Sequence, residues 1–365
     1  MKEIYSLLLS FPFEITFLYI ITQVIIFLAV CSVLLIMIVI LIRYADDRFD
    51  KKVSAFSEKY SALFFSYIGS ERNPEDFLAQ IPKTQINILL IFIQDYFQTL
   101  SGKELESLQK LTNDTWIYDL LINGLKSHSR RKILRAIYLG GVSNNHRIKP
   151  YLKDFLSHKD PLIFYHSARS LARMNAIEFA ERILAGASLH KEIGQDILVS
   201  IFLEFMPEVC NYLLKRIHIE DDRFKVVIVK ILRHFNYREA SSVIEKIISG
   251  TKSKLLILEL IKYAGQIECL EALATIKSFL NNEDSDIKIE AIKAVASIAG
   301  NNEVKSISIN VFDKSEQVQI DTAETLSELR PDGIYFLKKV AKNKKEARVA
   351  TIAQMVLSEL DLISK

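Results

Sequence analysis

The tetrapeptide Leu-Ser-Glu-Leu begins at Leu326 and again at Leu357, so its two copies lie 31 residues apart. The same interval runs through much of the chain. When the sequence is written in rows of 31, small or apolar residues fill one column, with a slip of one residue at the second position: Ala136, Ala168, Leu198, Val229, Leu260, Ala291, Thr322 and Ala353. A fixed period of roughly 20 to 50 residues is the mark of stacked repeats. The chain is therefore expected to fold as an array.

Each row has the pattern of two short antiparallel helices. In "DSDIKIEAIKAVASIAG", apolar residues at spacings of four, three and one follow a single helical face. Residues that favour helix ends flank such segments: Asp160, Ser285 and Ser315 as N-caps, and Gly265 and Gly300 as C-terminal breakers. Both leucines of each Leu-Ser-Glu-Leu copy are expected to face the core. One helix pair cannot bury its apolar faces alone, so the pairs must stack.

The rows resemble HEAT repeats, and in particular the short bacterial variety found in phycobilisome-lyase-type proteins. The segments "DPLIFYHSARSLARMNAIEFAERIL" and "SDIKIEAIKAVASIAGNNEVKSISI" carry the resemblance, which extends from about Trp116 to Leu360. It implies an all-α fold, a right-handed α-solenoid of HEAT-like helix pairs, here assigned to residues 86–365. One family feature is missing, because Tyr165, Lys288 and Gln319 replace a common arginine. Its loss puts in doubt a ladder of salt bridges between repeats.

The N-terminal region contains an uncharged run from Ile15 to Ile42. At about 1.5 Å per residue, a helix of this length crosses a hydrocarbon core roughly 30 Å thick. A cleaved signal peptide, a lipoprotein cleavage site ending at Cys31 and a buried core helix are the alternatives. The run is longer than a signal peptide requires, so a transmembrane helix over residues 15–42 is preferred.

The flanking charges predict how this helix is oriented. Lys2 is the one basic residue before it, whereas Arg43, Arg48, Lys51 and Lys52 follow it. Basic residues remain on the cytoplasmic side. We therefore expect a single-pass protein of the bacterial inner (cell) membrane, with residues 1–14 outside and the repeat domain in the cytoplasm.

Residues 43–85 form a separate juxtamembrane segment. Apolar residues there alternate at spacings of four and three, as in a short heptad seam: Phe49, Val53, Phe56, Tyr60, Leu63 and Tyr67. The preferred interpretation is an amphipathic helix that caps the first repeat, and the alternative is a homodimer through this helix. The segment "GSERNPEDFLAQIPKT" is the expected hinge.

Motifs that carry chemistry are missing from the sequence. The seven histidines and three cysteines lack metal-ligand spacing, and no phosphate-binding or nucleophile motif occurs. Catalytic residues, metal ligands and a cofactor are therefore not predicted. The net charge of +3 also argues against nucleic acid as a partner.

Two sets of charged residues are candidate interaction surfaces. The first is two basic runs, a candidate surface for anionic lipid or an acidic partner, with nucleic acid or a merely solvated face as alternatives: Arg130, Arg131, Lys338, Lys339, Lys342, Lys344 and Lys345. The second is a column that shares one phase of the period, namely Arg169, Lys262, Lys293 and, with opposite sign, Glu324. It would lie on the helices that line the concave surface in HEAT proteins. This mixed charge favours a protein partner over a phosphate groove, and the alternative is a solvated ridge with no partner.

The sequence thus predicts a membrane-anchored, non-enzymatic scaffold that binds proteins. The resemblance itself implies protein–protein interaction and no more. As the class of partner we expect a larger membrane machine, such as a polysaccharide glycosyltransferase or a signalling complex, in which the protein is an accessory. Two alternatives remain open: a binder of anionic lipid or nucleic acid through the basic runs, and a bilin-lyase-like enzyme.

Overall fold

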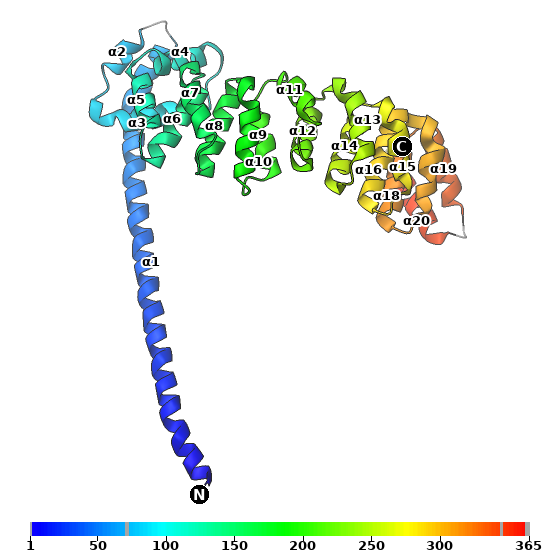
Figure 1. Cartoon of the computed structure of the whole chain (residues 1–365), viewed down its shortest axis with the longest axis horizontal. Coiled ribbons are helices and arrows are strands. Elements are labelled where there is room, and N and C mark those ends of the chain that lie inside the picture. Colours follow the sequence, from blue (N-terminus) through cyan, green and yellow to red (C-terminus); the bar gives the residue numbers. More distant parts are fainter. Residues whose placement is uncertain (1, 70–72, 344–345, 362–365) are drawn as a thin grey trace. The chain divides into compact units, whose positions relative to one another are not determined.

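The computed structural model describes the backbone of residues 2–69, 73–343 and 346–361. Within those ranges the protein is entirely helical, built from α-helices joined by turns and short 3-10 segments. The chain divides into two compact units, Met1–Asp119 and Leu120–Lys365. The division falls within helix α5 (Trp116–Leu125) (Figure 1).

A single long helix, α1 (Lys2–Ile68), forms the first half of the first unit. It continues without a break through the predicted membrane span and the predicted juxtamembrane helix. Its most apolar 18-residue stretch has a mean hydropathy of 3.5, and none of that stretch is buried within the protein. By length and composition α1 can serve as a membrane anchor or as a signal sequence.

The end of α1 packs against three shorter helices: α2 (Pro74–Leu78), α3 (Ile86–Tyr96) and α4 (Gly102–Asn113). Aromatic rings dominate this core. The ring of Phe64 lies 5.0 Å from that of Phe92 and 4.7 Å from that of Tyr96. Tyr67 donates a hydrogen bond of 2.8 Å to the carbonyl of Ser107 in α4. Edge-to-face and tilted ring pairs stabilise beyond the area that they bury.

The predicted heptad seam supplies part of this core. Phe56, Tyr60 and Tyr67 are buried within the first unit, together with Phe64, which lies outside the predicted pattern. Phe49, one turn or more closer to the apolar run, is exposed. Three of the six residues of the predicted seam are therefore buried within the chain.

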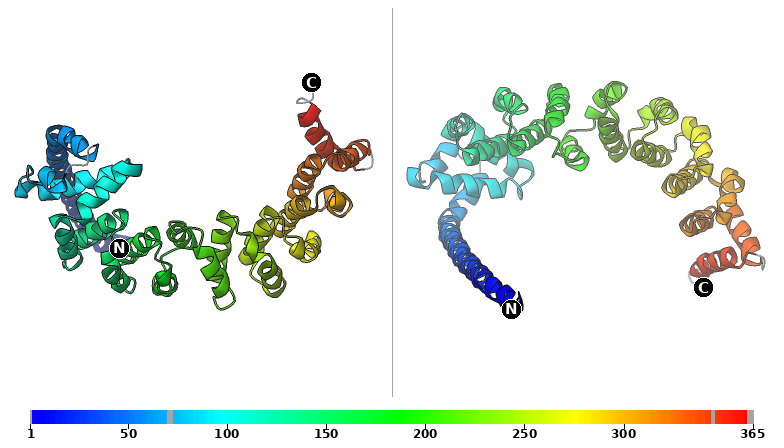
Figure 2. Two further views of the ribbon diagram at one scale, coloured as in Figure 1. Left: turned by 90° about the horizontal axis from the view of Figure 1, so that it is seen from above. Right: turned by 60° about the horizontal axis from the view of Figure 1, so that its bottom comes forward.

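The second unit consists of two layers of helices, which we call the long-helix layer and the short-helix layer after most of their members. The long-helix layer contains α6 (Arg130–Val142), α8 (Pro161–Arg173), α10 (Gln195–Phe202), α12 (Asp222–His234), α14 (Lys254–Gln266), α16 (Ser285–Ala299), α18 (Glu316–Glu328) and α20 (Ala347–Asp361). The short-helix layer contains α7 (Lys149–Phe155), α9 (Ala180–Leu189), α11 (Val209–Arg216), α13 (Ser241–Gly250), α15 (Leu273–Ser278), α17 (Val304–Ser308) and α19 (Asp332–Ala341). Figures 1 and 2 show the pairs following one another in chain order.

The 31-residue period corresponds to these helix pairs, which confirms the prediction of an α-solenoid. Every residue of the small or apolar column belongs to a helix of the long-helix layer and is at most 3% exposed. Small side chains there let neighbouring helices approach, while each repeat buries the apolar face of the next. The core is therefore a continuous strip that extends along the array.

The turn inside each repeat also recurs. Five residues that follow long helices have positive φ: Asn144, Asn175, Asn236, Glu268 and Gly300. After four of these helices, an amide donates to the carbonyl five residues earlier, as Cys269 does to Ala264 at 2.9 Å. This is the Schellman arrangement, which uses a left-handed residue to end a helix.

Several details differ from the sequence predictions. Asp284, not Ser285, caps α16, with its side chain accepting from the Asp286 and Ile287 amides. Gly265 lies inside the last turn of α14 and does not end it. Residue type indicates that a helix ends nearby, but it does not fix the exact capping residue, and a glycine can also serve close packing between helices.

The Leu-Ser-Glu-Leu copies occupy the same turn of α18 and α20, but their leucines are not equally buried. Leu326 is fully buried, whereas Leu329 is half-buried because it ends α18 as the C-cap. Leu357 and Leu360 are half-buried because no described helix follows α20 in its layer. The prediction that all four leucines face the core is wrong for these three.

Candidate functional site

The predicted column of charged residues lies on the long-helix layer. Arg169 belongs to α8, Lys262 to α14, Lys293 to α16 and Glu324 to α18. Their common phase follows from the repeat, since equal positions in stacked helices present side chains to the same side. The structure therefore brings the C-terminal members together on neighbouring helices, with Arg169 separated from them by α10 and α12.

Three of these four residues form ion pairs with the next repeat. Nζ of Lys293 lies 2.6 Å from Oδ1 of Asp321, and Nζ of Lys262 lies 3.9 Å from Oε1 of Glu290. Nε of Arg169 donates to Oε1 of Glu204 at 2.6 Å. The column is thus not a row of unpaired cations. Only Glu324 is exposed and without an ion pair among the residues that the structure describes.

These contacts belong to a ladder of ion pairs between repeats. Besides the pairs just given, the ladder contains Arg130–Asp160, Lys149–Glu178, Arg173–Glu204, Arg216–Glu181, Lys230–Asp196, Arg233–Glu259, Lys254–Asp284, Lys277–Glu303, Lys288–Asp313 and Arg348–Glu316. The missing family arginine has therefore not removed the ladder. Lys288, one of its replacements, itself makes a buried pair.

The ladder has a repeated order over α12 to α18. On α14, Glu259 faces back to Arg233 and Lys262 faces forward to Glu290, which belongs to α16. On α16 the order repeats, with Lys293 facing forward to Asp321. The acids 259, 290 and 321 keep the 31-residue spacing, so this signal was present in the sequence and was missed. Oε2 of Glu259 lies 3.1 Å from Arg233, at ion-pair distance but outside hydrogen-bond geometry.

Charge balance governs the protonation of these groups. Partial burial lowers the pKa of Lys293, but the hydrogen bond and charge of Asp321 outweigh it and hold that pKa above its ordinary value. Partial burial raises the pKa of Glu204, but hydrogen bonds from Arg173 and Arg169 outweigh burial and hold that pKa below its usual range. Both groups therefore stay charged around neutral pH.

A cavity of about 270 Å³ opens on this surface between α12, α14 and α16. Its charged lining is Arg233, Lys262, Glu290 and Lys293, and its other lining residues are Ile261, Gly265, Gln266, Ala294 and Ser297. The Lys262–Glu290 pair is the longest in the ladder, and its two side chains are 36% and 27% exposed. The cavity thus lies at the longest ion pair, or rung, of the ladder.

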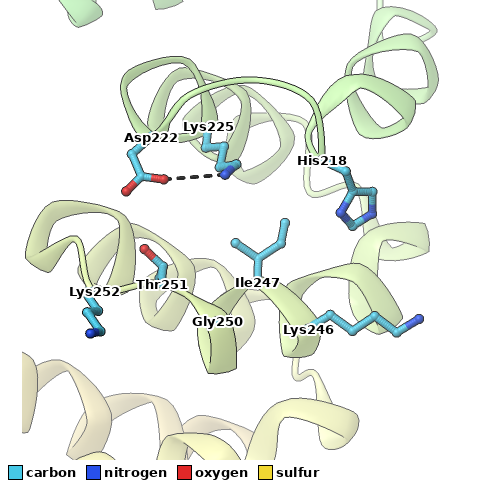
Figure 3. Close-up of a pocket in the computed structure, with 8 residues that line it drawn as sticks. All are labelled: His218, Asp222, Lys225, Lys246, Ile247, Gly250, Thr251 and Lys252. Atoms are coloured by element: carbon cyan, nitrogen blue, oxygen red, sulfur yellow. Dashed lines mark hydrogen bonds and ion pairs between the residues drawn. The ribbon is translucent and has the colours of Figure 1, made fainter.

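A second cavity, of about 300 Å³, lies at the turn between the α11 and α13 repeats (Figure 3). Lys225, Lys246, Lys252 and His218 surround it, and Asp222 pairs with Lys225 at 3.5 Å. Figure 3 shows the Lys246 and Lys252 side chains at opposite ends of the helix segment, so their charges do not converge on one point. This cavity is cationic but does not form a focused anion site.

The predicted basic runs are divided by the structure. Arg130 is engaged with Asp160, the N-cap of α8, through two hydrogen bonds, one of them 3.1 Å long. Arg131 is exposed. Lys338, Lys339 and Lys342 are exposed at the end of α19, and Lys344 and Lys345 lie outside the described residues.

The residues that the structure describes form no metal site, since no group of three His, Cys, Asp or Glu side chains among them could hold an ion. His190, a buried histidine, bonds through Nε2 to the carbonyl of His158 in the preceding repeat at 3.0 Å. Burial raises the pKa of the Cys210 thiol to about 11, so the reactive thiolate is scarce.

Comparisons with known proteins agree on the fold alone. No protein-family model matches the chain, and no curated protein matches it. A crystal structure of a Kap121p mutant matches with a TM-score of 0.50 at 11% identity, covering 76% of this chain and 37% of that one. A crystal structure of Kap121p matches at 0.49 and 11%, covering 77% and 38%, and an engineered protein at 0.37 and 14%, covering 84% and 96%. The chain is an all-α repeat solenoid similar to HEAT and armadillo structures, and it spans little over a third of Kap121p.

Proposed function

We propose that this protein is a non-catalytic docking scaffold, held at a membrane by α1, that binds a protein partner around the Lys262–Glu290 rung. The observation that carries the proposal is the cavity at the loosest rung of the ladder. Repeat solenoids typically bind proteins along extended surfaces. A rung at 3.9 Å between partly exposed side chains costs little to open, since exposed ion pairs stabilise by about 0–1 kcal/mol.

The chemistry of the surface specifies the partner in outline. Lys262 and Lys293 alternate with Glu290 and Glu324 along neighbouring helices. A partner with a mixed pattern of acids and bases fits such a surface better than a uniformly charged one, because like charges would repel. Gly265 and Ala294 are the small residues that line the cavity beside these charges.

The membrane anchor rests on α1. An exposed apolar helix of this length is costly in water and is satisfied in a bilayer. The basic residues that follow residue 42 favour a cytoplasmic repeat domain at the inner membrane. Anchoring would confine the scaffold and its partner to one surface and raise their effective concentration. A membrane machine, such as a polysaccharide glycosyltransferase or a signalling complex, is the partner class that we propose.

The docking site is tested by exchanging the charges of one rung. The double variant Lys262→Glu/Glu290→Lys keeps an ion pair between repeats but inverts the pattern that a partner meets. Its matched control is Lys149→Glu/Glu178→Lys, which exchanges a 3.1 Å pair elsewhere in the array. Each variant is crosslinked in its native membrane, and captured proteins are identified by mass spectrometry.

A protein captured by the wild type and the control, but lost from the Lys262/Glu290 variant, supports the proposed site. Equal capture by all three moves the docking surface away from this rung. Resistance of the full chain to alkaline carbonate extraction tests the anchor separately. A mature protein that lacks the first residues through Ile42 would instead identify α1 as a cleaved signal sequence.

A further inference from the structure

The short-helix layer exposes a surface near its C-terminal end that the docking site does not use. It is formed by α17, the 3-10 segment that follows it (η8, Ile309–Phe312) and α19. Three large side chains are exposed there, namely Ile309 at 68%, Phe312 at 47% and Tyr335 at 75%. Exposed apolar side chains scattered singly are ordinary, but neighbours on one face indicate an interaction site.

These side chains share one face because the two segments are equivalent. Ile307 and Leu337 are 30 residues apart, and both are fully buried against the array. At the same offset, Lys305 corresponds to Tyr335, Ile309 to Lys339, and Phe312 to Lys342. Since α17 contacts α19, the two exposed faces form one surface, which we call the α17/α19 face.

Unpaired lysines surround the apolar side chains of this face. Lys305, Lys338, Lys339 and Lys342 are exposed, and none makes an ion pair among the residues described. On α19 the exposed residues 335, 338, 339 and 342 have the i, i+3, i+4, i+7 spacing of one helical face. Asp332, at the start of α19, is the one acid in the two segments.

We infer that the α17/α19 face binds the surface of an anionic bilayer. Lysines meet the lipid phosphates while Ile309, Phe312 and Tyr335 enter the headgroup region, as in interfacial helices. The long stems of the lysines let their charges reach the headgroups beside the buried apolar side chains. The inference extends the proposed function, because α1 is what would bring a bilayer within reach of this face.

Two other occupants fit the face less well. Nucleic acid would use the lysines, and its bases could stack on Phe312 and Tyr335, but it has no use for Ile309, an aliphatic side chain without a stacking surface. An acidic protein would use both the lysines and the apolar side chains. Among the described residues, however, the face has no ion pair between repeats that would fix the register of a bound peptide. A fluid bilayer needs no such register.

The test uses the full chain reconstituted with vesicles of anionic phosphatidylglycerol or of neutral phosphatidylcholine, each with brominated acyl chains that quench tryptophan. The variant Tyr335→Trp places the reporter on the face. The unsubstituted chain, whose one tryptophan is Trp116, gives the background. The same samples are washed with alkaline carbonate, so that anchoring by α1 is measured beside contact of the face.

Charge reversal supplies the specificity control. Lys338→Glu/Lys339→Glu/Lys342→Glu, added to Tyr335→Trp, should reduce quenching by at least about tenfold, because each lysine near the surface adds attraction. The matched control reverses three exposed lysines that make no ion pair elsewhere in the array, namely Lys159, Lys191 and Lys252. It should leave quenching unchanged.

Quenching of the tryptophan reporter at position 335 in anionic vesicles, lost on reversal of the face and kept in the control, supports the inference. Carbonate-resistant protein without quenching overturns the inference and leaves the anchor in place. Quenching of carbonate-extracted protein supports the face and overturns the anchor. Equal quenching in neutral vesicles overturns the assignment to anionic lipid.

Discussion

Gly265 approaches Ala294 so closely that a Cβ atom on the glycine would lie 3.0 Å from the Cα and 3.1 Å from the Cβ of Ala294. The same relationship occurs four repeats earlier, where a Cβ on Gly141 would lie 3.1 Å from the Cα of Ser170. Both contacts join successive long helices at equivalent positions. Glycine therefore sets the distance between successive long helices at two places in the array.

Replacing this glycine should loosen the array. Gly265→Val inserts three carbons where even one is crowded by backbone, so we expect a loss of about 1–3 kcal/mol in the free energy of unfolding. Thermal unfolding of the full chain measures it. Gly250→Ala is the matched control, because nothing lies within 4 Å of its Cβ position. A variant as stable as the wild type would show that α14 and α16 separate without cost.

The buried pair of Lys288 and Asp313 should respond asymmetrically to substitution. Their side chains are 9% and 11% exposed, so Asp313→Asn leaves a charged lysine without its partner and is expected to cost about 3–5 kcal/mol. The double variant Lys288→Met/Asp313→Asn removes that charge and should recover most of the loss. Denaturant titration distinguishes the two. Equal destabilisation of both variants would mean that packing, not charge, holds this rung.

Acid should weaken the Glu204 rung. The pKa of Glu204 is held below its usual range in the folded chain, because hydrogen bonds from the two arginines outweigh burial. Its stabilisation is therefore complete above the unfolded-state pKa of about 4.3 and disappears as pH falls through the lower folded value. Glu204→Gln should be less stable than the wild type at pH 7, and the difference should shrink below about pH 4. A difference that is constant from about pH 3 to pH 7 would contradict this origin.

Glu268 should be improved by glycine. It has a φ of 55°, at the position that three other repeats fill with asparagine. The left-handed region costs a residue with a Cβ roughly 1–2 kcal/mol, so Glu268→Gly is expected to raise stability by about 1 kcal/mol. Thermal unfolding provides the readout. Glu271→Gly, in the next turn, should give no gain.

The fold could be predicted from the sequence because the core repeats itself. Ala136, Leu260 and Ala353 occupy equivalent buried positions in different repeats, so one packing requirement is recorded many times. Leu329 and Leu357 were mispredicted for a local reason. Helix periodicity says which face a residue belongs to, but not where the helix ends or whether another helix covers it.

The ion pairs of the site were less predictable, because a pair depends on the length of its side chains as well as on their positions in the 31-residue period. In the 31-residue period, Arg233 lies two residues beyond the position equivalent to Lys262 and Lys293. Its long side chain still reaches Glu259. The α17/α19 face was predicted only as a basic run, since Ile309 and Phe312 come from the preceding repeat. Proximity between repeats becomes visible only once the array is built.

The order of charges in the ladder has a consequence for how such arrays change length. On α14 and α16 an acid that faces backward precedes a base that faces forward. In a duplicated copy of the α14 repeat, the residue equivalent to Glu259 would pair with the base of the preceding repeat. The residue equivalent to Lys262 would pair with the acid of the following repeat. Whole rows can therefore be gained or lost by recombination with these rungs still neutral, so natural selection can adjust the reach of the scaffold without redesigning these joints.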